Sequence, residues 1–424
     1  MATNSFSKEE IVQFENVIEG FQDALVASKN VNTYGTDGQL MERTNDTIWR
    51  PQQYISVGGD RIVGSAVTPK NKVQLSVPST IGYQPGDFFE LDALEMRDAL
   101  QEGRLGMASK DYLASRINTD VLAVATTQAT VVIPVSTAPG DYDDIALCDS
   151  YFNETGVPGD SRFMMFNSRD YNGMAGNLAA RETMTGLPEG AYKNSYIGRV
   201  AEFETFKLDS GRRIAAAAGG ASLTMDTQAA AGNYYVPVAT RTSSTGEVGN
   251  VDNRYQTVTV SSTTSVAAGD ALTFDGIEAI HMINKTATGQ LKTYRVIEVL
   301  SATTMVISPP IISNQGGSDV EEAYQNCVVT PDATADLNFL NTDATGYNVF
   351  WRKPAIEILP GRYAVPSGQG AEVLRATTDN GIEVVMTKRF DTSTFKTLFT
   401  FDCRYGVVMT GPEQCGILLF NQTP

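Results

Sequence analysis

Residues 221–345 constrain the fold most, because they predict a self-contained β module set inside a longer chain. The stretch 251–260, VDNRYQTVTV, alternates apolar and polar residues, and the turn residues Ala268, Gly269 and Asp270 separate it from a second alternating run at 272–276. A period of two is typical of strands, and turn residues between such runs indicate hairpins. Further short runs follow at 277–283, 294–300 and 305–307. Short strands at near-regular spacing predict a small closed barrel or a sandwich.

The segments on either side of the module, 130–220 and 346–424, share a different pattern. In 130–220, strand-like runs alternate with short helical stretches, and 346–424 opens on the strongly apolar run 347–351. Alternating strands and helices predict an α/β arrangement. Because both segments carry this character, we expect them to form one discontinuous axial domain, interrupted by the module at 221–345.

The first 83 residues predict two extensions. Residues 1–50 predict an arm that opens with an amphipathic helix, because Ser7 and Glu10 have the spacing of a capping box. Apolar residues follow on one face of this helix: Phe14, Ile18, Phe21 and Leu25. Residues 51–83 then alternate with a period of two and predict an extended β-hairpin loop. A hairpin with so few apolar residues needs a neighbour to be stable.

Residues 84–129 predict a long spine helix in a peripheral domain. Asp87 and Glu90 have the spacing of an N-cap pair, and an apolar stripe at helical spacing runs from Phe88 to residue 124. This stripe is longer than that of an ordinary globular helix. Gly103 and Gly106 interrupt it and predict a bend in the spine helix.

Charge and composition limit the classes of function. The chain of 424 residues has 42% apolar residues and a formal net charge of −17. The apolar content is typical of a globular chain, and the acidic balance argues against free nucleic-acid binding, which needs a basic footprint. The first ten residues do not resemble a signal peptide, and no apolar run of about 18 residues occurs, so we expect a soluble protein made in a cytoplasm.

The residues give little support for catalysis. His281 is the only histidine in the chain. The sequence therefore does not support a histidine-based catalytic triad or a zinc site, and we expect a structural role for His281. Asp141, Asp143, Asp144 and Asp149 lack the spacing of a calcium loop and are better explained by a solvated loop leading into a helix. The four cysteines contain no C-x-x-C pair and predict free buried thiols. We expect no catalytic, cofactor-binding or metal site, although a hydrolase acting through two carboxylates remains open.

The polar stretch 240–254 supports two interpretations. It carries charges of both signs: Arg241, Glu247, Asp252 and Arg254. One interpretation is a solvated loop. The other is a reciprocal contact between two copies across a two-fold axis, because such a contact must be self-complementary in charge.

The order of these parts resembles that of the major coat proteins of P22-like short-tailed phages, which have an HK97-like capsid fold with an inserted β-barrel domain. The resemblance covers essentially the whole chain. It is carried by five stretches: NDTIWRP at 45–51, DFFEL at 87–91, VDNRYQTVTV at 251–260, AGDALTF at 268–274 and NVFW at 348–351.

The resemblance implies an α+β capsid fold and an icosahedral shell of pentamers and hexamers, with triangulation number seven. It also implies a scaffolding protein, a portal at one vertex, and a procapsid that expands when double-stranded DNA is packaged. The loop 241–254 would correspond to a loop that reaches across local two-fold axes. We further expect the hairpin loop to lie on an adjacent subunit through Asp60 or Arg61 near its tip. The alternative is another structural virion component, such as a tail or decoration protein.

Overall fold

A computed structural model describes the following residues: 11, 14, 25–35, 47–53, 55–56, 58, 63, 66, 69–92, 103–140, 142–180, 197–208, 212–218, 223–226, 234–363, 372–378 and 380–423. The chain divides into two compact units. Unit 1 comprises Met1–Ile48, Pro78–Val124 and Ile356–Val408, and unit 2 comprises Trp49–Val77, Ala125–Ala355 and Met409–Pro424.

A six-stranded mixed sheet forms one half of unit 2. Its order is β5-β24-β18-β6-β8-β7, so it joins strands from both sides of the 221–345 segment. The strands are β5 (Val131–Pro134), β24 (Cys415–Leu419), β18 (Asn348–Arg352), β6 (Arg162–Asn167), β8 (Phe203–Leu208) and β7 (Arg199–Val200). The central strand β18 is almost wholly buried, which explains why 349–351 is a continuous apolar run and not an alternating one.

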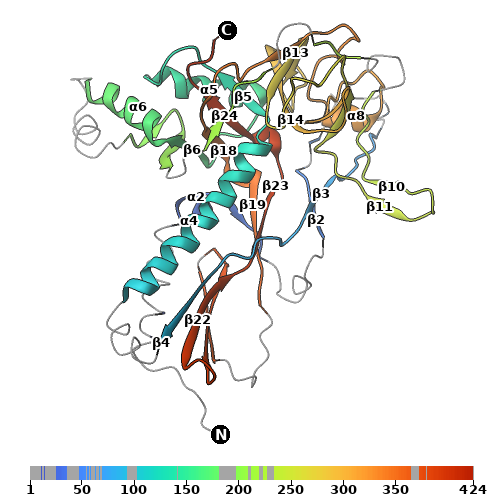
Figure 1. Ribbon diagram of the computed structural model, residues 1–424. Coiled ribbons are helices and arrows are strands. Elements are labelled where there is room, and N and C mark those ends of the chain that lie inside the picture. The colour runs from blue at the N-terminus through green and yellow to red at the C-terminus, as the bar shows by residue number, and fades with distance from the viewer. Residues whose placement is uncertain are drawn as a thin grey trace. The chain divides into compact units, whose positions relative to one another are not determined.

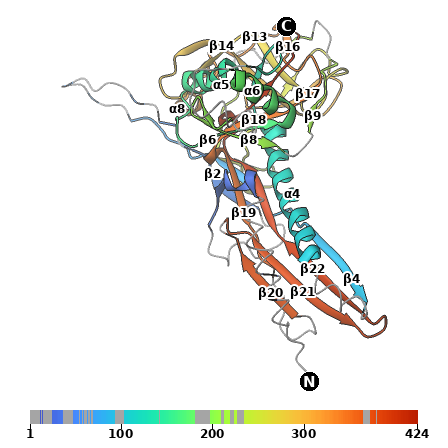
Figure 2. The ribbon, with the colours of Figure 1, turned by 90° about the vertical axis from the view of Figure 1, so that its left-hand side faces the viewer.

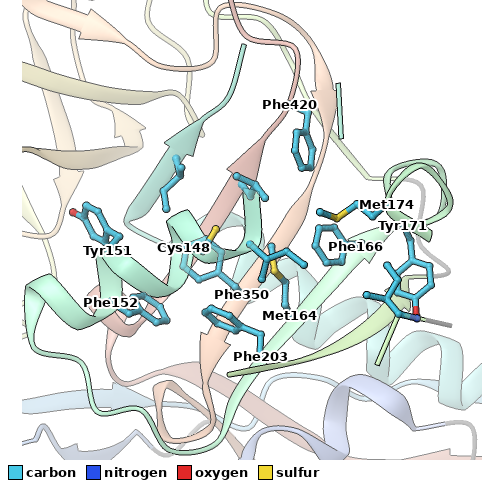
Figure 3. Packing of buried hydrophobic residues seen from close by; sticks show 14 of the residues in the cluster. Cys148, Tyr151, Phe152, Met164, Phe166, Tyr171, Met174, Phe203, Phe350 and Phe420 are labelled. Carbon is cyan, nitrogen blue, oxygen red and sulfur yellow. The ribbon is translucent and has the colours of Figure 1, made fainter. Parts of the chain in front are cut away.

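Helices α5 (Tyr142–Thr155) and α6 (Ser168–Ala180) contribute to the core of this sheet. Phe152 of α5 packs against Phe350 of β18, with ring centroids 5.0 Å apart, and against Phe203 of β8 at 6.0 Å. Figure 3 shows these rings meeting between helix and sheet, with Met164 and Phe166 of β6 beside them. The apolar faces of the helices and the sheet therefore share one core.

The other half of unit 2 is an antiparallel barrel. Five strands follow the order β12-β15-β14-β13-β16: β12 (Gln256–Thr259), β15 (Thr304–Ser308), β14 (Ala287–Val299), β13 (Ala271–Ile280) and β16 (Leu337–Phe339). The segment 223–226 joins the two edges, because Thr224 pairs with Asp336 beside β16 and Met225 pairs with Val260 beside β12. The interior is apolar and includes Val258, Phe274, Tyr294 and Met305. Of the barrel and the sandwich that the sequence left open, the structure is the closed barrel.

Two short ribbons belong to unit 2 as well. Strand β9 (Arg213–Ile214) pairs with β17 (Thr345–Gly346), so the chain enters and leaves the barrel side by side. Strand β10 (Thr240–Thr242) pairs with β11 (Val248–Asn250) in a hairpin that projects from the barrel (Figure 1). Short elements complete the unit: α8 (Asp319–Tyr324), η1 (Lys353–Ala355) and η2 (Pro412–Gln414).

Unit 1 contains a four-stranded antiparallel sheet in the order β20-β21-β22-β4 (Figure 2). Its strands are β20 (Glu372–Thr377), β21 (Glu383–Asp391), β22 (Lys396–Cys403) and β4 (Gly86–Asp92). A three-stranded sheet has the order β1-β19-β23, formed by β1 (Asn32–Thr33), β19 (Ile356–Pro360) and β23 (Tyr405–Met409). Helix α2 (Val26–Lys29) also lies in this unit, and the long helix α4 (Gly103–Gln128) begins in it. Strand β2 (Ile48–Pro51) pairs with β3 (Ser76–Ser79).

The predicted start of the spine helix was wrong. Residues 86–92 form strand β4, so Asp87 is not a helix cap; its carboxylate accepts a hydrogen bond from Ser109 Oγ at 2.6 Å. Phe89 stacks on Phe399 of β22, with ring centroids 5.4 Å apart, while Phe88 is 63% exposed. Cross-strand pairing of this kind stabilises a strand. The helix begins at Gly103, and Gly106 lies in its first turn.

The described residues include only part of the predicted arm and hairpin loop. Phe14 and Leu25 are buried within the chain, at 5% and 0% exposure. Ile18, Phe21, Asp60 and Arg61 lie outside the described residues, as do Ser7 and Glu10 of the predicted capping box. The proposals for these residues remain predictions.

Candidate assembly surfaces

The hairpin β10–β11 presents a continuous exposed surface. Every residue from 240 to 250 is exposed, and Val248 is 68% exposed. The turn is closed by hydrogen bonds from Ser243 N to Glu247 O at 2.8 Å and from Gly246 N to Ser243 O at 3.0 Å. Gly246 has a φ of +87°, a conformation that glycine adopts without steric cost. The exposed strands therefore end in a defined turn.

The base of the hairpin is held by buried polar side chains. Asn253 is 5% exposed; its Nδ2 donates to Val238 O at 2.9 Å, and its Oδ1 accepts from Val238 N at 3.1 Å. Arg254 Nη2 pairs with Asp252 Oδ2 at 2.6 Å, and Arg254 Nη1 donates to Met409 O at 2.8 Å. These contacts anchor both strands of the hairpin where they leave the barrel.

The four charged residues singled out in 240–254 thus fall into two groups. Arg241 and Glu247 lie on the exposed hairpin, where a second molecule can reach them. Asp252 and Arg254 bind each other within one chain and are mostly buried, with side-chain exposures of 20% and 8%. A contact between copies therefore has Arg241 and Glu247 available, while Asp252 and Arg254 position the hairpin.

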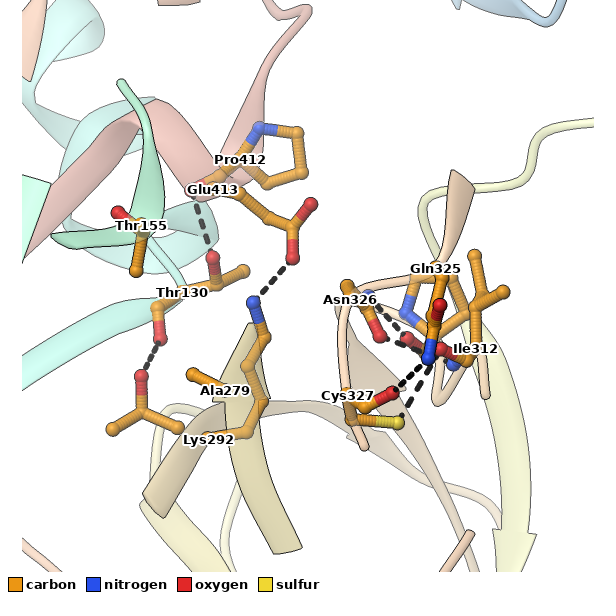
Figure 4. Close-up of polar contacts among 12 residues, drawn as sticks. Thr130, Thr155, Ala279, Lys292, Ile312, Gln325, Asn326, Cys327, Pro412 and Glu413 are labelled. Atoms are coloured by element: carbon orange, nitrogen blue, oxygen red, sulfur yellow. Dashed lines mark hydrogen bonds and ion pairs between the residues drawn. The ribbon is translucent and has the colours of Figure 1, made fainter. Parts of the chain in front are cut away.

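A row of polar contacts joins the barrel to the six-stranded sheet, and the sequence did not predict it. Lys292 of β14 pairs with Glu413 of η2, and Thr293 Oγ1 donates to Thr130 O at 2.7 Å (Figure 4). Thr130 Oγ1 in turn donates to Pro412 O at 2.8 Å. Burial lowers the pKa of Lys292, but the facing carboxylate of Glu413, together with Tyr151, more than offsets this, so its pKa lies above its ordinary value. The only sequence signal was a lysine among barrel-strand residues.

The acidic cluster at 141–149 has structural partners. Asp143 and Asp144 occupy the first turn of α5, where acidic side chains favour the helix dipole. Asp149 pairs with Arg162, whose side chain is fully buried and also donates to Val157 O at 2.6 Å. Asp141 lies outside the described residues.

His281 also has a local structural role. Its Nδ1 accepts from the backbone N–H groups of Ile283 and Asn284, both at 3.2 Å, within the turn between β13 and β14. In the part of the chain that the structure describes, no group of three or more His, Cys, Asp or Glu residues could hold a metal ion. No helix in the described ranges is long and apolar enough to cross a membrane.

Several solved structures are similar to parts or most of this chain. A structure of Mycobacterium phage Che8 matches 93% of this chain and 90% of its own at 11% identity, with a TM-score of 0.44. The capsid of cyanophage P-SCSP1u matches 92% and 85% at 9% identity, with a TM-score of 0.42. The coat protein I-domain of CUS-3 matches 29% of this chain and 98% of its own at 31% identity, with a TM-score of 0.22.

An α+β chain with an inserted barrel and an exposed, charged hairpin on a fixed base has surfaces suited to contacts between copies of a structural protein. The family model described as "P22 coat protein - gene protein 5" matches residues 1–421, and the chain belongs to this family. It is a major capsid protein of a tailed bacteriophage, a component of the virion, and it assembles with copies of itself into a shell. The predicted capsid identity is thereby confirmed, and the described helices and strands confirm the predicted α+β class.

Proposed function

We propose that this chain tiles an icosahedral shell of triangulation number seven as pentamers and hexamers. The shell assembles in the bacterial host cytoplasm as a procapsid on a scaffolding protein, has a portal at one vertex, and expands as double-stranded DNA is packaged. The chain contributes surfaces and no catalysis. Membership of the coat protein family supports this proposal.

The observation that carries the proposal is the exposure of the whole β10–β11 hairpin on a firmly held base. A protruding hairpin without an apolar core of its own is marginally stable in water. A two-fold contact requires a self-complementary patch, and the hairpin carries one cation and one anion, Arg241 and Glu247. Arg241 of one copy would thus face Glu247 of the next.

Such contacts suit a lattice because each one is weak. An exposed ion pair contributes only ~0.2–1 kcal/mol, so a wrongly placed subunit can dissociate before the shell closes. The same contact is repeated at every two-fold position, so the total across a shell is large. The net charge of −17 also suits a container, because a wall of the same sign as DNA does not bind the packaged genome.

The experiment is a charge swap in the hairpin. R241E and E247R would each be expressed with the phage's own scaffolding protein, and closed particles would be quantified by sedimentation and electron microscopy. Each single variant should yield fewer closed shells, and the double variant R241E/E247R should recover them, because it restores opposite charges across the two-fold axis. R169E, which reverses another exposed arginine, is the matched control. Single variants that assemble like wild type would exclude the hairpin contact.

A further inference from the structure

Helix α8 lies against the base of the 51–77 loop within unit 2. Lys70 forms an ion pair with Glu322 of α8. Asn71 N donates to Asp319 Oδ2 at 2.8 Å, and Tyr324 Oη donates to Val73 O at 2.9 Å. Three positions of the loop base, 70, 71 and 73, are therefore bound by residues from one short helix.

An apolar cluster reinforces these polar contacts. Leu75 of the loop is 2% exposed and packs with Ile312 and Tyr324, which are 5% and 8% exposed. Ile55 and Val73 pack against the same cluster from the loop side. The cavity between α8 and residues 70–73 measures only ≈ 10 Å³, which is space for about one water molecule. The loop base and the helix thus form a closely packed contact.

Helix α8 is itself held at both ends. At its start, Ser318 and Glu321 form a capping box, with Ser318 N donating to Glu321 Oε2 at 3.1 Å. At its end, Lys285 Nζ donates to Ala323 O at 2.9 Å and to Gln325 O at 3.2 Å. Lys285 belongs to the turn between the barrel strands β13 and β14, so the barrel fixes the helix in place.

Both ends of the loop leave from this contact together. Gln52 N donates to Leu75 O at 2.9 Å, and Gln74 Nε2 donates to Gln52 O at 2.7 Å. Further along, Lys72 Nζ donates to Ser56 Oγ at 2.6 Å. Whatever holds residues 70–75 therefore also orients residues 52–56.

We infer that α8 is a docking platform for the 51–77 loop of its own chain, and that it sets the direction in which this loop extends towards a neighbouring copy. The described residues between Pro51 and Ser76 form no strand, so they need support from outside the loop to hold a direction. The inserted module thereby controls an assembly element outside its own sequence range. The second half of this inference rests on the proposed shell function, whereas the docking itself does not.

The docking is tested in the full-length monomer by hydrogen exchange of the backbone amides at 71–75. E322K and K70E should each speed exchange, and the swap K70E/E322K should restore slow exchange. Y324F loses the hydrogen bond to Val73, and exchange should rise roughly fivefold if a single net hydrogen bond is lost. D332K reverses the charge of an exposed acid on the same module and should leave exchange at 71–75 unchanged.

The directing role is tested by assembly of the same variants with scaffolding protein. Variants with fast exchange at 71–75 should form fewer closed shells and more open or aberrant particles, and the double swap should reverse both effects together. Unchanged exchange in E322K, K70E and Y324F would overturn the docking. Fast exchange with wild-type assembly would overturn the directing role. If wild type itself formed no shells, the proposed function would fail, while the exchange data would still decide the docking.

Discussion

The ion pair between Lys292 and Glu413 offers a test of how the barrel is joined to the six-stranded sheet. Lys292 has a side-chain exposure of 8% and Glu413 one of 21%. The two partners are therefore unequal: the ammonium is buried, while the carboxylate is partly reached by water. Removing the carboxylate and removing the ammonium should therefore lower the free energy of unfolding by different amounts.

The structure predicts which loss costs more. In E413Q the Lys292 ammonium stays buried without a counter-ion. Breaking a fully buried pair in this way costs about 3–5 kcal/mol, and the partial exposure of this one reduces the expected cost to about 2–3 kcal/mol. In K292M the remaining carboxylate can be solvated, so the expected loss is about 1 kcal/mol. The double variant K292M/E413Q should resemble K292M, because it contains no buried charge.

The assay is urea unfolding of the monomer, followed by circular dichroism, with the free energy of unfolding extrapolated to water. The four proteins form a double-mutant cycle with an expected coupling of about 2 kcal/mol. Equal losses in the two single variants, or a double variant whose loss is their sum, would refute the assignment of a buried ammonium that depends on Glu413.

Three further predictions concern single positions. Asn341 is fully buried, accepts from Ala271 N at 3.0 Å and donates to Ala215 O at 3.0 Å, so N341A should lower the free energy of unfolding in urea by about 2–4 kcal/mol. Gly156 has a φ of +83°, and a Cβ there would lie 2.7 Å from Cε1 of His281, so G156A should cost about 1–3 kcal/mol, part of which H281A recovers in the double variant. Burial lowers the pKa of Lys285 from 10.5 to about 8, so the unfolded chain binds this proton more tightly than the folded chain does. Stability should therefore rise between about pH 8 and pH 10 in wild type relative to K285M, and parallel pH profiles of the two proteins in urea would contradict this.

Local patterns were sufficient where an element is stabilised by its nearest neighbours in sequence. The alternation at 251–260 predicted a strand, of which Gln256–Thr259 forms as β12, and the runs at 272–276 and 277–283 were predicted separately but form the single strand β13. The run 347–351 predicted the buried strand β18. The same logic failed at 86–92, where an apolar stripe fitted a helix. The strand there is selected by pairing with β22, about three hundred residues further along the chain, and no local pattern contains that information.

For the candidate surfaces, too, the sequence predicted the segment but not the contacts of its residues. The sequence identified an excursion with charges of both signs at 240–254, but four charged residues looked equivalent in it. Only the structure separates the exposed Arg241 and Glu247 from Asp252 and Arg254, because burial and pairing depend on Met409 and other distant residues. The contact between α8 and the loop base could not be predicted from the sequence, in which only the capping box of α8 is recognisable.

The sequence alone therefore predicted a β module inside a longer chain. The periodicity of side chains carries that information, because it follows from the geometry of one strand or one helix. The α/β prediction for 346–424 was too coarse, because the described residues there form strands and the short helices η1 and η2, and 356–408 belong to unit 1. The tertiary structure decided how 223–226 closes the barrel, which residues hold the loop base, and which charges remain exposed. These depend on contacts between residues far apart in the chain, whose free energy exists only once the fold has brought them together.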